Sequence, residues 1–226
     1  TLREVIRGVL SLIRGKRERT VAQAREMREF AERLGGMWVT LMRLASVRTD
    51  LLGAAYCREL ALTRDLAAPS PFAEIRKVVE ADMLKVGTTF EETFVEFDET
   101  PLNVRSFTQV HRARLAKNNR EVLVRVRSPD APQRAQTDWR YLRVLLFFLR
   151  QLDLEPHLRW DDLGFEVKKA TDDCLDLRTE VEELRRIRKV LRKRRIYVPM
   201  IYRRYCTERV LVQEYIQGVS VSDLVL

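Results

Sequence analysis

The stretch REVLVRVRSPD, residues 120–130, decides the fold that we expect. Its three valines alternate with Leu123, Arg125 and Arg127, which is the two-residue period of a β-strand with two different faces. Arg125 is a full charge in the middle of that strand, where a half-buried sheet usually takes a smaller or apolar side chain. Three roles are open for this arginine: it does chemistry, it replaces a residue that did, or it faces water.

A second strand-like run, FTQVHRARL (107–115), precedes the first, and AKNNR (116–120) joins the two. Asn118 and Asn119 tolerate the positive φ of a tight turn, so the pattern predicts a β-hairpin. Apolar residues at helical spacing after the hairpin predict a helix that contains Trp139, Leu142, Leu146, Leu149 and Leu152.

A long helix is expected from about Asp161 to Arg194. Its apolar residues recur in steps of four and three, as in a heptad seam: Leu163, Val167, Ala170, Cys174, Leu177, Val181 and Leu184. If unbroken, it would run roughly 50 Å at about 1.5 Å per residue and would brace the whole domain. On this seam Cys174 is most simply a buried small side chain. Two strands, Val198–Tyr202 and Arg209–Tyr215, are expected after the helix.

The part of the chain before residue 100 has helical patterns. Residues 1–19 place apolar side chains on one stripe and arginines and a lysine on the other face and the tail. This pattern fits a helix on an anionic membrane surface, and it also fits a helix packed on its own domain or on a partner. Phe90, Phe94 and Phe97 share one face at helical spacing, which indicates core packing.

Composition narrows the class of protein. The 226 residues are 46% hydrophobic and 33% charged, which is typical of a globular protein with a sizeable core. The net charge of +9 favours acidic partners, although a basic solvated surface would give the same number. No motif that reads nucleic acid accompanies the charge, so we expect no nucleic-acid partner. Cys57, Cys174 and Cys206 lie far apart, which predicts a reducing compartment and no metal site.

Six segments have distinctive motifs: LGGMWVTLMRLASVRTDLLGAAYCREL, PSPF, FVEFDETPLNVRSFTQVHRARL, VLVRVRSP, CLDLRTEV and TERVLVQEYIQG, which ends on Glu214, Tyr215, Ile216, Gln217 and Gly218. The order of elements resembles a kinase N-lobe behind a helical extension, and these motifs resemble the UbiB (AarF/ADCK) family of atypical kinases from about Ala31 onward. The resemblance implies an α+β fold in which a small antiparallel sheet packs with a long αC-type helix. It implies a helical extension over residues 1–99, a kinase-like N-lobe over 100–218 and the start of a hinge or C-lobe over 219–226.

The departures from the family pattern are informative. On the kinase plan, Arg125 occupies the position of the strand lysine that holds the nucleotide phosphates, and Glu180 occupies that of its helix glutamate. The resemblance therefore implies a structural ion pair between Arg125 and Glu180. Four other positions of the nucleotide site depart from the family: Thr40 replaces a lysine, Arg43 a glutamine, Cys174 a glutamate, and Asn103 a small residue of the small-residue loop. Three positions keep the family residue: Ser106 in that loop, Asp176, and Glu214 in the hinge-like motif.

Asp176 and Glu180 are four residues apart and would share one helix face. They are open to two interpretations: relics of a Mg²⁺–nucleotide site, or a solvated acidic stripe matched by the many arginines. The sequence as given ends eight residues past Gly218, so we expect no catalytic-loop or metal-binding aspartate in it. We therefore predict no catalytic residues, no metal and no cofactor.

The resemblance implies two functions. The first is a degenerate UbiB-like pseudokinase that acts as a scaffold or accessory subunit with protein partners in a larger complex, at a quinone- or lipid-related membrane. The second is an atypical kinase or ATPase of the family in coenzyme Q or lipid metabolism, with ATP and Mg²⁺, whose C-lobe lies outside this chain. The family setting implies the mitochondrial or plastid inner membrane in a eukaryote and the cytoplasmic face of the inner membrane in a bacterium.

Overall fold

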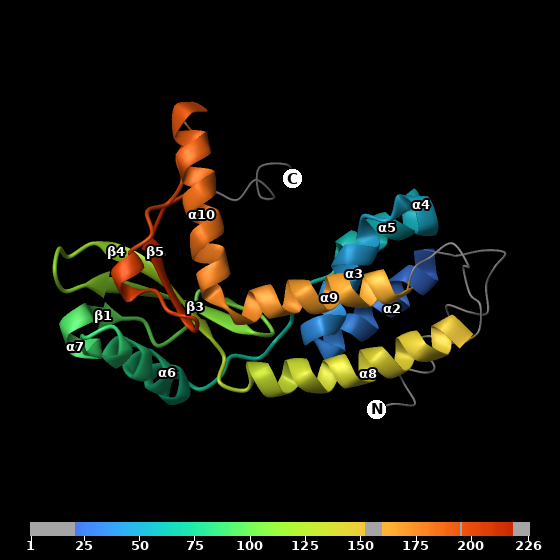
Figure 1. The fold of residues 1–226 in the computed structure, drawn as a ribbon, viewed down its shortest axis with the longest axis horizontal. Helices are drawn as coiled ribbons and strands as arrows, with labels where there is room; N and C mark the ends of the chain where they lie inside the picture. The colour runs from blue at the N-terminus through green and yellow to red at the C-terminus, as the bar shows by residue number, and fades with distance from the viewer. Residues whose placement is uncertain (1–20, 152–159, 195, 219–226) are drawn as a thin grey trace. The chain divides into compact units, whose positions relative to one another are not determined.

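The computed structural model describes residues 21–151, 160–194 and 196–218 (Figure 1). The chain forms two compact units. We call the first the helical unit; it contains the chain through Ala68, Val104–Phe107 and Asp130–Cys174. We call the second the sheet unit; it contains Pro69–Asn103, Thr108–Pro129 and the chain from Leu175 onward. Residues 69–99, which we assigned to the helical extension, fold with the sheet.

The helical unit is built from amphipathic helices whose apolar stripes meet in one core. Its buried members include Ala31 of α2, Trp38 of α3, Leu60 of α5, Leu142 of α8 and Val167 of α9. The helices are α2 Val21–Leu34, α3 Gly36–Ser46, α4 Thr49–Leu52, α5 Ala54–Ala61, α8 Ala131–Gln151 and α9 Trp160–Leu175, whose last residue belongs to the sheet unit.

The sheet unit contains an antiparallel sheet in the order β1-β3-β4-β5. The alternation in REVLVRVRSPD decides its two faces. The even-numbered valines of β4 are fully buried in a core with Ile75 and Met83 of α6. On the opposite face, Leu211 of β5 packs with Leu177 and Val181 of α10. The elements are α6 Phe72–Lys85, α7 Phe90–Thr93, β1 Phe94–Phe97, β2 Asn103–Val104, whose second residue belongs to the helical unit, β3 Thr108–Leu115, β4 Glu121–Arg127, α10 Leu177–Leu191, the 3₁₀ turns Arg192–Arg194 and Arg203–Tyr205, and β5 Val210–Glu214.

The predicted hairpin is confirmed. Strands β3 and β4 pair from Thr108–Arg127 to Arg114–Glu121, and Asn119 has the positive φ of 56° that the turn requires. The phenylalanines expected on one helix face are instead divided between α7 and β1, although Phe90, Phe94 and Phe97 still pack against one another, tilted or edge to face, at ring-centroid distances of 5.3–5.5 Å.

The single long helix that we predicted is wrong. Helix α9 ends at Leu175 and α10 begins at Leu177, with an extended backbone at Asp176 (φ −114°, ψ 96°). The aspartate side chain accepts the N–H of Arg178 and starts a new helix, and a local cap of this kind overrides a heptad pattern. Cys174, predicted to be buried on the seam, is exposed.

The strand predicted at Val198–Tyr202 is also wrong. Pro199 lacks an N–H to donate, and this segment forms one isolated bridge, between Ile201 and Gln213, before the 3₁₀ turn Arg203–Tyr205. Residues 1–19, Leu152 and residues 219–226, which also carried predictions, lie outside the described residues. Within the described ranges, no helix is long and apolar enough to cross a membrane. Those ranges also hold no group of three or more His, Cys, Asp or Glu side chains suited to a metal ion.

Candidate functional site

Arg125 lies on β4 opposite Leu211 of β5, with its side chain on the face of the sheet that α10 covers. The structure brings it together with Glu180, in the first turn of α10. Its Nη1 lies 2.5 Å from Oε1 and 2.6 Å from Oε2 of that glutamate. The two side chains are 26% and 31% exposed, so the pair is partly shielded from water. Both carboxylate oxygens of Glu180 therefore contact the guanidinium of Arg125, which occupies the position of the strand lysine.

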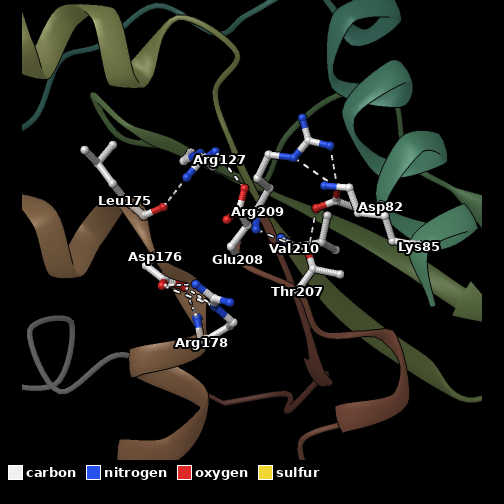
Figure 2. A network of polar contacts seen from close by, with 10 residues as sticks. All are labelled: Asp82, Lys85, Arg127, Leu175, Asp176, Arg178, Thr207, Glu208, Arg209 and Val210. Carbon is white, nitrogen blue, oxygen red and sulfur yellow. Dashed lines mark hydrogen bonds and ion pairs between the residues drawn. The ribbon is translucent and has the colours of Figure 1, made fainter.

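Arg127, the next residue on the same face of β4, holds the chain just before α10. Its Nη1 donates to the carbonyl of Leu175 at 2.6 Å, and its Nη2 lies 3.5 Å from Glu208 (Figure 2). The backbone N–H of Leu177 in turn donates to the carbonyl of Glu208. Two arginines on one strand thus fasten the start of α10 to the sheet.

Asp176 does not share a helix face with Glu180. It stands at the N-cap of α10, where its Oδ1 accepts the N–H of Arg178 at 3.0 Å and its carboxylate pairs with the guanidinium of the same residue (Figure 2). This contact with Arg178 holds the pKa of Asp176 below its usual range. The capping role accounts for the aspartate without any nucleotide or metal.

A buried carboxylate network, which sequence reasoning missed, joins α6 to the turn before β5. Asp82 is fully buried and accepts the hydroxyl of Thr207 at 2.5 Å and Nε of Arg209 at 3.0 Å (Figure 2). Nη2 of Arg209 and Nζ of Lys85 also contact it. Burial raises the pKa of Asp82, but these partners outweigh burial and leave the pKa below its usual range.

Ser106, in the small-residue loop, is 2% exposed and belongs to the helical unit. Its N–H and its hydroxyl both donate to the carboxylate of Asp65, at 2.8 and 2.6 Å. The same hydroxyl accepts the N–H of Gly36, at the start of α3, at 2.5 Å. The loop is therefore fixed by its own unit through the Asp65–Ser106–Gly36 chain of hydrogen bonds.

We expect Asp65→Asn to destabilise the helical unit by about 1–2 kcal/mol, because an amide is a weaker acceptor for two largely buried donors. Amide hydrogen exchange at Ser106 should accelerate in parallel. Asp172→Asn is the matched control, since Asp172 makes an exposed i,i+4 pair with Lys168 in the same unit. Equal effects of the two variants would contradict the role assigned to Asp65.

The other predicted positions are divided between the units. Thr40 is half-buried and Arg43 exposed on α3, and Cys174 is exposed on α9. Asn103 is exposed in the sheet unit. At the end of β5, Glu214 accepts the hydroxyl of Tyr197 at 2.6 Å and the N–H of Met200 at 3.0 Å. Its bond to Tyr197 keeps the pKa of Glu214 below its usual range. Glu214 is thus hydrogen-bonded to the segment that precedes β5, within the sheet unit.

A small antiparallel sheet whose central strand forms an ion pair with the first turn of a packed helix defines a kinase-like N-lobe. A family model described as the ABC1 atypical kinase-like domain matches residues 62–226. The chain belongs to this family, the UbiB family of atypical kinase-like proteins.

Several relatives are similar over most of the chain. "Probable protein kinase UbiB" of Aeromonas hydrophila is 34% identical over 195 residues, which are 85% of this chain and 35% of that protein. The protein of the same name from Aeromonas salmonicida is 31% identical over 211 residues, 92% of this chain and 38% of the relative. The chain thus spans little more than a third of the length of these relatives. The solved structure of the Rv3197–erythromycin complex from Mycobacterium tuberculosis matches with a TM-score of 0.58 and 28% identity, over 82% of this chain and 45% of that one.

Proposed function

We propose that this chain is a catalytically degenerate UbiB-family module, which keeps the N-lobe architecture as a scaffold or accessory subunit and does not transfer phosphate. The observation that carries the proposal is that an arginine, Arg125, occupies the position of the strand lysine, with its guanidinium engaged by both carboxylate oxygens of Glu180. A planar guanidinium does not replace a compact ammonium in a tight phosphate pocket. Arg125 here serves the packing of α10 on the sheet.

The small-residue loop supports the same proposal. In a nucleotide-binding loop, backbone N–H groups must be open to phosphate. The N–H of Ser106 is already bonded to Asp65, a negative charge that would also repel phosphate. Val104 and Arg105 add bulk where the backbone should approach the ligand closely. The residues present therefore fit ATP and Mg²⁺ poorly.

A second candidate is a working kinase or ATPase. The presence of the strand-to-helix ion pair favours it, since an active kinase lobe also needs its strand cation joined to the helix glutamate. In that case ATP and Mg²⁺ would be the cofactors, and catalytic groups would come from protein outside this chain.

Binding of ATP with Mg²⁺ by the purified chain separates the two candidates, because hydrolysis under the second candidate would need catalytic groups from outside this chain. We expect no saturable ATP binding below about 1 mM, because the phosphate contacts of a functional site are missing. Arg125→Lys should not restore saturable binding. Glu183→Gln, an exposed change on the same helix as Glu180, is the control. Saturable ATP binding that Glu180→Gln removes and Glu183→Gln keeps would support the second candidate instead.

We also propose that the module works at a quinone- or lipid-related membrane complex, with protein partners. The support for this proposal is the setting that membership of the UbiB family implies, at a bacterial, mitochondrial or plastid inner membrane. The basic amphipathic pattern of residues 1–19 agrees with a location at an anionic surface.

A further inference from the structure

An open basic groove lies on the sheet unit, along the second half of α10 and the segment that precedes β5. Its volume is about 870 Å³, and seven of its nine lining side chains are arginine or lysine. Arg185, Lys189 and Arg192 recur at helical spacing along one wall, and Arg203 stands on the other wall. The groove is separate from the Arg125–Glu180 pair, since neither residue lines it.

The carboxylate in the groove does not balance its charge. Glu182 accepts Nη1 of Arg185 at 2.7 Å and lies 3.6 Å from Nη2 of Arg203. The side chains that line the groove therefore carry a net of six positive charges. A helix C-terminus attracts cations, but its dipole amounts to only about half a negative charge. Neither the dipole nor Glu182 explains why so many cations gather on both walls.

Such a concentration of like charges destabilises the folded chain unless an anion offsets it, and a concave surface focuses the field on the space that it encloses. Arginine forks match the geometry of phosphate oxygens, because each can donate two parallel hydrogen bonds. A single phosphate would occupy a small part of this volume and meet few of the cations. A ligand with several clustered phosphates would meet both walls at once.

We propose that the groove between α10 and Arg203 is a binding site for a polyphosphorylated ligand, in which several phosphate groups are clustered on a compact frame. The ligand chemistry is the same in a soluble polyphosphate and in the headgroup of a polyphosphorylated phospholipid. Nucleic acid is disfavoured, since none of the described residues that line the groove is aromatic and able to stack on bases. This inference is independent of the proposed loss of catalysis.

Binding can be tested on the full chain with inositol hexakisphosphate by calorimetry, and with vesicles that contain phosphatidylinositol 4,5-bisphosphate by flotation. The test variant is Arg186→Ala/Lys189→Ala/Lys193→Ala, three exposed groove residues. The control is Lys77→Ala/Lys117→Ala/Arg143→Ala, which removes the same number and kinds of exposed charges elsewhere. An exposed ion pair changes affinity by about threefold to fivefold, so we expect the test variant to bind at least about 30-fold more weakly and the control to bind within about threefold of the wild type. Circular dichroism checks that both variants are folded.

The two probes distinguish the source of the ligand. Groove-dependent binding of the soluble probe supports a free polyphosphate, groove-dependent binding of the vesicles alone supports a lipid headgroup, and both results support the site. Equal losses in the test variant and the control would overturn it, as would equal flotation with phosphatidylserine vesicles of matched charge. Tighter groove-dependent binding of a single-stranded RNA than of either probe would also overturn it in favour of nucleic acid.

Discussion

Asp82→Asn is expected to destabilise the sheet unit by about 3 kcal/mol at neutral pH. The substitution removes one partner of a buried ion pair and leaves Arg209, only 24% exposed, without its carboxylate. It also weakens the position of Thr207, whose hydroxyl accepts the N–H groups of Arg209 and Val210 and so shapes the turn into β5. Urea unfolding followed by circular dichroism, with hydrogen exchange of the β5 amides, measures the loss.

Glu80→Gln on the same helix is the matched control. Glu80 pairs with Arg76 across one helical turn, but both side chains are at least 40% exposed, so we expect a change of no more than about 0.5 kcal/mol. An Asp82→Asn protein that unfolds within that margin of the wild type would contradict the importance of the network.

The pH dependence of the unfolding free energy is a second test of the same variant. Because the folded-state pKa of Asp82 lies below its unfolded value, its stabilisation is fully present above about pH 4 and is lost as the pH falls through the folded pKa. The difference in unfolding free energy between the wild type and Asp82→Asn should therefore be largest at neutral pH and shrink in acid. Asparagine does not titrate, so the variant supplies the baseline.

Gly36→Ala should destabilise the helical unit by about 2–4 kcal/mol. Gly36 has a φ of 55°, which costs about 1 kcal/mol for a residue with a side chain. An added Cβ would also lie 2.3 Å from Oδ2 of Asp138. That oxygen accepts the N–H of Met37 at 3.1 Å, so the carboxylate would have to move and leave a bond at the start of α3 unmade.

Gly87→Ala separates the two causes, because Gly87 also has a positive φ, of 77°, but has open space where a Cβ would be. We expect it to cost only the conformational term, about 1 kcal/mol. Trp38, Trp139 and Trp160 all belong to the helical unit, so urea unfolding followed by tryptophan fluorescence reports on the unit that contains Gly36. Gly87 belongs to the sheet unit, so unfolding followed by circular dichroism measures its variant. If Gly36→Ala proves no more harmful than Gly87→Ala, the close approach of Asp138 is not a constraint.

The hairpin could be predicted because its signals are local. The two-residue alternation of β4 determines which side chains face α6, and an asparagine pair marks the turn between two strands. The contact of Arg125 with Glu180 could be expected only from the family resemblance. These residues are 55 positions apart, and nothing in the composition or spacing of either segment points to the other.

The break between α9 and α10 was missed because the heptad pattern continues through it. The spacing of apolar residues does not change when one residue between two helices is extended. The cap at Asp176 depends instead on one hydrogen bond, from the N–H of Arg178 to the aspartate side chain. The Asp82–Arg209 contact was out of reach for another reason. It joins residues 127 positions apart, and an aspartate inside an amphipathic helix normally indicates a solvent-facing position.

The division of the chain into two units also has a consequence for how the protein folds. The backbone passes from one unit to the other five times, after residues 68, 103, 107, 129 and 174. Neither unit is a continuous segment, so a fragment that ends near residue 99 would lack Leu142 and Val167 from its core. Native contacts must close long loops before either core is complete, which slows folding. On a ribosome, the helical core has to wait for residue 167 to emerge, long after its first helix has been made.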